Sequence, residues 1–348
     1  MKQFGTGLVV GKFSPLHLGH ELLIRRAMAA CEETLVISYS EPELPGCESR
    51  LREQWLRARF PQAVVLVLHN DQHALPHNDA DALVHRQLMG WACAHLLKRE
   101  IDAVFTSEDY GDGFAAELSR YFGGRPVEHV MVDQARALVP VSGTRIRSDP
   151  HAHRAFLSPE VYASFVQTVC FLGGESSGKS TMAEAMAGQL ETVRAAEYGR
   201  ELWVAKDGQL AYEDMRHIGE VQQQRERQLR GQANRFLICD TSALTTLFYS
   251  REMFDRADPA LEDMAQQRYD HVFLCAPDFD FVQDGTRREA GFRQRQHDWY
   301  VAELARRHIP YILLTGALPQ RIATVLKHLD GYFTPSYTSL VKNSPLMT

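Results

Sequence analysis

The chain has 348 residues, a length that predicts two domains at roughly 100–200 residues per domain. Hydrophobic residues make up 45% and charged residues 24%, fractions that are ordinary for a folded globular protein. With 38 basic and 44 acidic residues the net charge is −6, which argues against a protein that wraps nucleic acid.

Two further classes are disfavoured by the distribution of apolar residues and cysteines. The charge-free stretch at 161–174 is too short and too polar to span a bilayer, and the N-terminus leads directly into a strand-like run without the apolar core of a signal peptide. The six cysteines are scattered and form no CxxC pair, which favours reduced thiols over a disulfide framework. We therefore expect a cytoplasmic protein without membrane insertion.

Short apolar runs alternate with longer amphipathic segments in the first half of the chain. Strands are predicted at 7–10, 34–38, 63–68, 103–106 and 128–132, and helices at 18–32, 48–60, 79–98 and 112–121. This alternation predicts a parallel sheet covered by helices on both faces, with ligands bound at the carboxyl ends of the strands.

The same alternation restarts after a polar segment punctuated by prolines at positions 150 and 159. Strands are predicted at 168–172, 236–240, 272–275 and 311–314, and helices at 179–190, 212–230, 241–254, 291–307 and 319–329. The predicted fold class is α/β, with two doubly wound parallel-sheet domains at 1–160 and 161–330. Residues 331–348 remain an unassigned tail.

A phosphate-binding loop follows the first strand of the second half. Residues 173–180 match G-x-x-x-x-G-K-[ST], and a helix begins directly after them. Backbone N–H groups and the helix N-terminus would surround an anion, Lys179 would reach the β- and γ-phosphates of ATP, and the Ser180 hydroxyl would bind Mg²⁺. The nucleotide-binding residues predicted here are Gly173, Gly174, Glu175, Ser176, Ser177, Gly178, Ser180 and Thr181.

Three further positions in the second half fit phosphoryl transfer. Asp240 ends an apolar strand, as the acid of a Mg²⁺ site does, although such an acid also caps a following helix. Arg287 lies in a polar loop that would close over ATP as a lid, and a solvated basic turn is the alternative. Glu197 follows a short strand, where it would accept a proton or bind a ribose, or act only as an acid at a helix start.

A second phosphate-binding signal follows the first strand of the chain. His17 and His20 form an H-x-G-H motif at a predicted helix N-terminus, where two imidazole N–H groups and the helix dipole can meet a phosphate. Gly19 between them allows the backbone to approach a ligand closely. A zinc site is disfavoured because no third ligand lies at a suitable spacing.

The segment 141–147 adds a second anion-binding helix start after the fifth strand. It combines the hydroxyls of Ser142 and Thr144 with the guanidinium of Arg147. The first half of the chain is therefore expected to have its own phosphate site.

The segments GKFSPLHLGH (11–20) and SGTRIR (142–147) resemble the nucleotidyltransferase superfamily, which carries H-x-G-H and S/T-x-x-R signatures. Combined with the phosphate loop, residues 5–330 resemble the NadR-type bifunctional family, in which a nicotinamide-mononucleotide (NMN) adenylyltransferase precedes a ribosylnicotinamide kinase. The resemblance also covers 105–108, 197–200, 240–241, 245–246 and 284–287.

The resemblance implies two reactions and further site residues. The second half would phosphorylate nicotinamide riboside with MgATP, and the first would join NMN and ATP to give NAD and pyrophosphate. His17, His20, Lys12, Thr144 and Arg147 would then bind the phosphates of ATP. The remaining residues implied at the nucleotides or substrates are Gly11, Phe13, Ser14, Gly19, Glu108, Ser142, Tyr198, Thr241 and Phe281.

The sequence departs from the pattern of the family in two respects. The first strand begins too early to leave room for the helix-turn-helix domain of some relatives, so no binding to nucleic acid is expected. Phe281 lies where relatives are expected to carry Trp, which would weaken stacking on a nicotinamide ring.

Several alternatives stay open at this point. One is a nucleotidyltransferase–kinase fusion with other small-molecule substrates, and another is a nucleotide-sensing regulator without turnover. The sequence also leaves open a functional link to a riboside transporter and a homo-oligomeric state.

Overall fold

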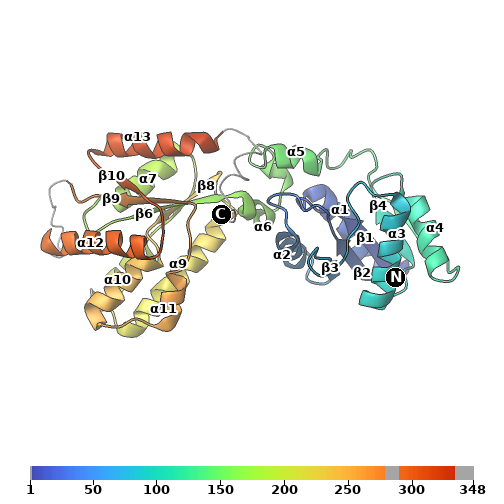
Figure 1. Ribbon diagram of the computed structural model, residues 1–348, viewed down its shortest axis with the longest axis horizontal. Coiled ribbons are helices and arrows are strands. Elements are labelled where there is room, and N and C mark those ends of the chain that lie inside the picture. The colour runs from blue at the N-terminus through green and yellow to red at the C-terminus, as the bar shows by residue number, and fades with distance from the viewer. Residues whose placement is uncertain (1, 279–289, 334–348) are drawn as a thin grey trace. The chain divides into compact units, whose positions relative to one another are not determined.

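Figure 1 shows the computed structural model of the chain, which describes residues 2–278 and 290–333. The chain forms two compact units that divide between Ser164 and Phe165. Each unit is built around its own five-stranded sheet.

The sheet of the first unit is parallel throughout. Its strands are β1 (Phe4–Gly11), β2 (Cys31–Ser38), β3 (Val64–Val67), β4 (Ala103–Thr106) and β5 (Glu128–Met131), in the spatial order β3-β2-β1-β4-β5. The chain runs from β1 to one edge and then returns to β4 on the other side of β1. The switch point, where ligands bind in such sheets, is therefore at the carboxyl end of β1.

The helices of the first unit cover both faces of its sheet (Figure 1). They are α1 (Leu18–Ala30), α2 (Ser49–Arg59), α3 (Ala82–Trp91), α4 (Gly111–Tyr121), α5 (Gly143–Ser148) and α6 (Pro159–Tyr162). Met89 of α3 and Phe114 of α4 pack against Leu8 in one buried cluster. Val9, which points to the opposite face, is also fully buried, as expected when helices cover both faces.

The predicted helix at 79–98 is wrong in one respect. After α3 the chain continues as a π-helix over Ala92–Leu97 and stops at Lys98, which has a left-handed backbone with φ of +55°. Hydrophobic periodicity does not distinguish the wider π turn from an α turn over so few residues.

The sheet of the second unit is also parallel. Its strands are β6 (Gln167–Leu172), β7 (Arg194–Ala195), β8 (Phe236–Asp240), β9 (His271–Cys275) and β10 (Ile312–Leu314), in the order β10-β9-β6-β8-β7. The strand that precedes the phosphate loop, β6, is thus central, with β8 and β9 as its neighbours.

Helices again cover both faces. They are α7 (Lys179–Gln189), α8 (Tyr198–Ala205), α9 (Tyr212–Arg230), α10 (Ala243–Phe254), α11 (Pro259–Met264), α12 (Ala290–Arg306) and α13 (Leu318–Leu329). Met182 of α7 and Val325 of α13 pack on one face against Phe171 and Phe273 of the sheet. Helices α9, α10 and α12 lie on the other face (Figure 1).

The predicted fold class, α/β with two doubly wound parallel sheets, is confirmed. The six cysteines are all buried and free. Over residues 2–278 and 290–333, none of the helices is both long and apolar enough to cross a membrane.

Candidate active sites

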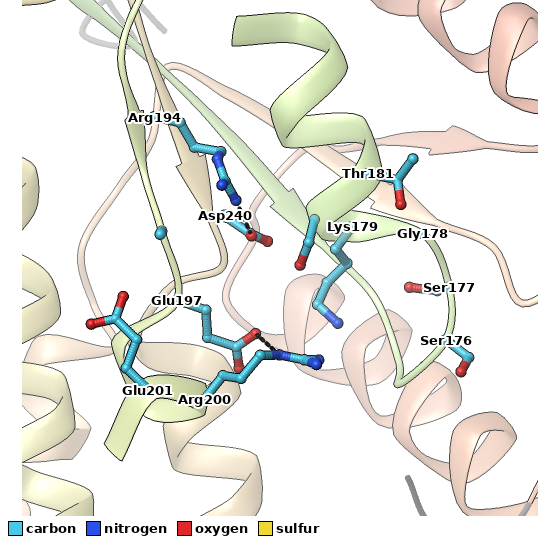
Figure 2. Close-up of a pocket in the computed structure, with 12 residues that line it drawn as sticks. Ser176, Ser177, Gly178, Lys179, Thr181, Arg194, Glu197, Arg200, Glu201 and Asp240 are labelled. Carbon is cyan, nitrogen blue, oxygen red and sulfur yellow. Dashed lines mark hydrogen bonds and ion pairs between the residues drawn. The ribbon is translucent and has the colours of Figure 1, made fainter. Parts of the chain in front are cut away.

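The phosphate loop of the second unit connects β6 to α7. Gly178, the residue before α7, has φ of +83°, a conformation that a residue with a side chain rarely adopts. A pocket of about 310 Å³ lies beside the loop. Figure 2 shows Lys179, Glu197 and Asp240 pointing into the same space between the loop and the start of α8. The residues that line the pocket are Ser176, Ser177, Gly178, Lys179, Ser180, Thr181, Arg194, Ala196, Glu197, Arg200, Glu201 and Asp240.

The loop is held in shape by three side chains from other elements. The Gln296 side-chain oxygen accepts a hydrogen bond from the Glu175 N–H at 2.8 Å, and the Tyr249 hydroxyl donates to the Glu175 carboxylate at 2.8 Å. Arg321 of α13, which is 2% exposed, donates to the Ser177 carbonyl at 2.8 Å. Lys179 donates from Nζ to the Gly174 carbonyl at 3.1 Å, so its ammonium lies over the loop it belongs to.

Asp240 ends β8 and points into the pocket (Figure 2). Its Oδ2 accepts a hydrogen bond from Arg194 at 3.1 Å, whereas its Oδ1 is buried and has no partner among the described residues. Asp240 does not cap the next helix, because Ser242 caps α10 and that helix begins at Ala243. A buried carboxylate oxygen without a partner, in a pocket that also contains the Ser180 hydroxyl, fits a hard divalent cation such as Mg²⁺.

Glu197 lies at the N-cap position of α8, but its side chain makes no capping hydrogen bond. Its Oε2 lies 4.0 Å from Nε of Arg200. Burial raises the pKa of the Glu197 carboxyl and the charge of Asp240 raises it further, while Lys179 lowers it. A carboxylate that binds a proton more readily than usual is suited to general-base chemistry.

Not every predicted residue of this unit lines the pocket: Gly173, Gly174 and Glu175 of the loop do not, and neither do Tyr198 and Thr241. The Tyr198 N–H donates to the side-chain oxygen of Gln222 at 3.0 Å, and the Tyr198 hydroxyl contacts His217 at 3.2 Å. Thr241 is buried and its hydroxyl donates to that of Thr245. Phe281 and Arg287 lie outside the described residues.

The H-x-G-H motif of the first unit forms the start of α1. His17 is the N-cap residue, and its Nδ1 accepts a hydrogen bond from the His20 backbone N–H at 3.3 Å. The two rings stack with centroids 3.6 Å apart, and the ring of Phe13 meets His20 edge-on at 5.1 Å. Nδ1 of His20 is buried and has no partner among the described residues. A Cβ added at Gly19 would lie 3.1 Å from the His17 ring, so the glycine permits this stacking.

Both histidines are neutral at neutral pH. Burial lowers the pKa of His17 to about 4, and the nearby charge of Arg136 lowers it further. Burial and the adjacent His17 lower the pKa of His20 well below its ordinary value. The motif therefore presents two neutral imidazole rings.

The second anion-binding segment contacts the first. Ser142 caps α5 by accepting a hydrogen bond from the Arg145 N–H at 3.3 Å. Arg147 donates to the Ser14 carbonyl and, at 3.1 Å, to the Thr144 hydroxyl. The segment after β1 and helix α5 are thus in direct contact.

The backbone between β1 and the histidines is held by hydroxyl groups. The Lys12 carbonyl accepts hydrogen bonds from Ser14 at 3.0 Å and from Ser38 at 3.2 Å. Arg52, which is fully buried, donates to the Ser38 hydroxyl at 2.8 Å. Gly11 ends β1, and the Lys12 side chain is exposed, so its ammonium is accessible to a ligand.

Glu108 follows β4, and its carboxylate lies 3.5 Å from a guanidinium nitrogen of Arg136. Both side chains are about half exposed. Within the described part of the chain, no group of three or more His, Cys, Asp or Glu residues could hold a metal ion.

Four charged residues at these sites were assigned no site role from the sequence. Arg200 and Glu201 line the pocket one helical turn after Glu197, a spacing that was a usable signal. Arg194 and Arg136 belong to no sequence motif. Each lies in a different segment of the chain, and folding brings it close to its site.

Comparisons with known proteins found a matching family model and similar proteins. A family model described as an AAA domain matches residues 168–321, all in the second unit. The "Trifunctional NAD biosynthesis/regulator protein NadR" of Salmonella typhimurium is 29% identical over 312 residues, which cover 82% of this chain and 72% of that protein.

Two crystal structures of NadR proteins share the fold. One, in complex with NR, has a TM-score of 0.70 and 20% identity and covers 95% of this chain and 97% of its own. Another, with NAD and AMP-PNP, has a TM-score of 0.68 and 19% identity and covers 96% and 98%. Taken with the sequence match, they show that this chain is similar to the NadR proteins and has the fold of the solved members.

Proposed function

We propose that the chain is a two-site transferase of NAD biosynthesis, in which the second unit phosphorylates nicotinamide riboside and the first adenylylates the NMN that results. The homology to NadR proteins, which are named for NAD biosynthesis, supports this proposal. So do the ligands NR, NAD and AMP-PNP of the two solved relatives. The observation that carries it is that each unit has a motif segment at the carboxyl end of its central strand, 11–20 in the first and 173–180 in the second.

In the second unit, the 5′-oxygen of the riboside would attack the γ-phosphorus of ATP while the bond to the ADP oxygen breaks. The hydroxyl proton would pass to the carboxylate of Glu197, whose raised pKa favours its acceptance. Lys179 would move from the Gly174 carbonyl to the phosphates. Mg²⁺, held by Ser180 and Asp240, would supply positive charge to the phosphate oxygens.

In the first unit, a phosphate oxygen of NMN would attack the α-phosphorus of ATP, and the bond to pyrophosphate would break. The nucleophile is already ionised, so no proton has to be removed from it. Positioning and charge stabilisation then account for most of the rate acceleration. The ring N–H groups of His17 and His20 would donate to the α-phosphate, while Lys12, Thr144 and Arg147 would hold the departing pyrophosphate.

The proposal is tested by incubating the purified chain with ATP, Mg²⁺ and a panel of pyridine ribosides and nucleotides. We expect NMN from nicotinamide riboside and NAD from NMN. Turnover of other substrates only would favour a different transferase–kinase pair. Tight nucleotide binding without any product would favour a nucleotide-sensing regulator.

A further inference from the structure

Arg194 reaches the kinase pocket through strand pairing. In the parallel pair of β7 and β8, Arg194 lies opposite Ile238. Side chains two residues apart on a strand share a face, so Ile238 and Asp240 lie on the same face as Arg194. The guanidinium extends forward by two residues to meet the carboxylate at the end of β8 (Figure 2).

This contact fixes one of the two oxygens of Asp240. The Arg194 guanidinium donates to Oδ2 at 3.1 Å, and the Asp240 side chain is only 2% exposed. An aspartate carboxylate otherwise turns easily about its last bond, because that torsion has broad energy wells. A charge-assisted hydrogen bond to Oδ2 therefore sets the direction of Oδ1.

The other oxygen has no partner among the described residues. Leaving a buried acceptor unpaired is energetically costly, and more so when the group is charged. A buried carboxylate oxygen without a hydrogen-bond partner in a native pocket indicates a ligand that would interact with it. Neither nearby cation supplies it: Nζ of Lys179 is placed at the Gly174 carbonyl, and Arg200 lies beside the other pocket acid, Glu197.

We propose that Arg194 is a positioning residue of the phosphotransfer site, which holds Oδ2 of Asp240 so that Oδ1 faces the divalent cation of metal–ATP. This inference rests on the proposed kinase function. Partners that orient a metal-binding carboxylate from behind typically change metal affinity by about 10–100-fold when removed. The role assigned to Arg194 is thus to tune the cation site, without contacting the riboside.

The test is calorimetric titration of Mn²⁺ into the full chain saturated with a non-hydrolysable ATP analogue. Two classes of cation site are expected, one for each unit. In Arg194→Ala we expect one class to weaken about tenfold or more while the other is unchanged. The Mg²⁺ concentration for half-maximal riboside phosphorylation should rise by the same factor.

Two further variants complete the experiment. Arg194→Lys retains a positive charge but lacks the rigid planar guanidinium, and it should recover part of the lost affinity, so a generally misfolded pocket is distinguished from a lost contact. Arg216→Ala removes an exposed arginine that pairs with Glu220 on α9, outside the pocket, and should leave both readouts unchanged.

An Arg194→Ala chain that binds Mn²⁺ as the Arg216→Ala chain does would overturn the inference. So would tighter binding, because Arg194 would then compete with the cation for Asp240. Failure of the proposed function is recognised separately, since it would abolish riboside phosphorylation in the unmodified chain without altering the Mn²⁺ titration.

Discussion

The guanidinium of Arg147 donates a hydrogen bond to the carbonyl oxygen of Ser14, which lies 133 positions earlier in the chain. This bond joins the two phosphate-binding segments of the first unit, one after β1 and the other at α5. The approach is close because Gly143 has no side chain: a Cβ there would lie 2.8 Å from the same carbonyl oxygen.

Gly143→Ala should therefore separate the two segments. We expect NAD formation from NMN to fall at least tenfold, since displacements of about 1 Å cost on the order of 10²-fold in rate, while riboside phosphorylation is unchanged. Gly188→Ala is the matched control, because a Cβ at this position of α7 meets no atom within 4 Å. It should leave both activities intact and stabilise the second unit by about 0.5–1 kcal/mol in urea unfolding.

His20→Ala should lower NAD formation from NMN by orders of magnitude, because the buried imidazole would supply a donor at the reacting phosphate. Riboside phosphorylation should survive, as the second unit has its own core and site. Rates of both reactions in one preparation provide the measurement. Equal loss of the two would show that the variant is unfolded or that the assignment of the units is wrong. His77→Ala, which removes an exposed histidine, is the control.

Lys179→Ala should abolish NMN formation from the riboside but leave NAD formation from NMN. The lysine is the one side chain of the phosphate-loop motif that is expected to reach the β- and γ-phosphates. Lys327→Ala, an exposed lysine on α13, should have no effect on either rate. NMN production by Lys179→Ala at the normal rate would show that the loop is not the kinase site.

Glu197→Gln should lower kcat of riboside phosphorylation about 10²–10⁴-fold if the carboxylate is the general base. Because burial raises the pKa of Glu197, the rate of the unmodified chain should fall as the pH drops through that pKa. This fall in rate at low pH, the acid limb of the pH–rate profile, should be absent from the residual activity of the variant. Glu213→Gln, at an exposed position near the start of α9, should retain both the rate and the limb.

Buried His271, which contacts the half-buried His328, should make the stability of the second unit sensitive to acid. His271 is 5% exposed, its Nδ1 lies 3.1 Å from Nε2 of His328, and burial lowers its pKa from 6.5 to about 4. Between these two values the unfolded chain binds more protons than the folded one, so stability rises with pH over this range. The contribution of His271 is complete above pH 6.5 and is lost as the pH falls toward 4.

His271→Phe should reduce this dependence on pH. From pH 7.5 to pH 5, the stability of the second unit should fall by about 2 kcal/mol less in the variant than in the unmodified chain. Urea unfolding at the two pH values gives the comparison. An identical loss in both proteins would mean that the acid sensitivity arises elsewhere.

Much of the fold was predictable from local sequence signals. The strand before each phosphate loop is a short apolar run, and α1 and α7 begin at the motif residues themselves, so the two loops could be placed without the structure. Local sequence patterns do not reveal the order of the strands in each sheet. Pairing of β1 with β4, and of β6 with both β8 and β9, depends on contacts between distant segments.

The residues that support the sites were harder to predict from the sequence. Arg136, Arg194 and Arg321 lie in different segments and belong to no motif, yet each acts on a predicted site residue through a hydrogen bond or a charge. Arg52 acts one step further away, through the Ser38 hydroxyl that donates to the Lys12 carbonyl. Their spacing along the chain has no relation to their function, because the fold brings them into contact. A motif search therefore found the groups expected to touch the nucleotide but not those that hold these groups in place.

The central claim, two transfer reactions in one chain, predicts a definite product ratio. Phosphorylation of the riboside releases ADP, and adenylylation of NMN releases pyrophosphate, so each NAD formed from nicotinamide riboside should be accompanied by one ADP and one pyrophosphate. The most direct measurement is quantification of NMN, NAD, ADP and pyrophosphate over time with the purified full chain, ATP, Mg²⁺ and the riboside. We predict transient NMN followed by NAD, ADP and pyrophosphate in equal amounts. ATP consumption without NMN or NAD, or NAD formation without ADP, would contradict the account.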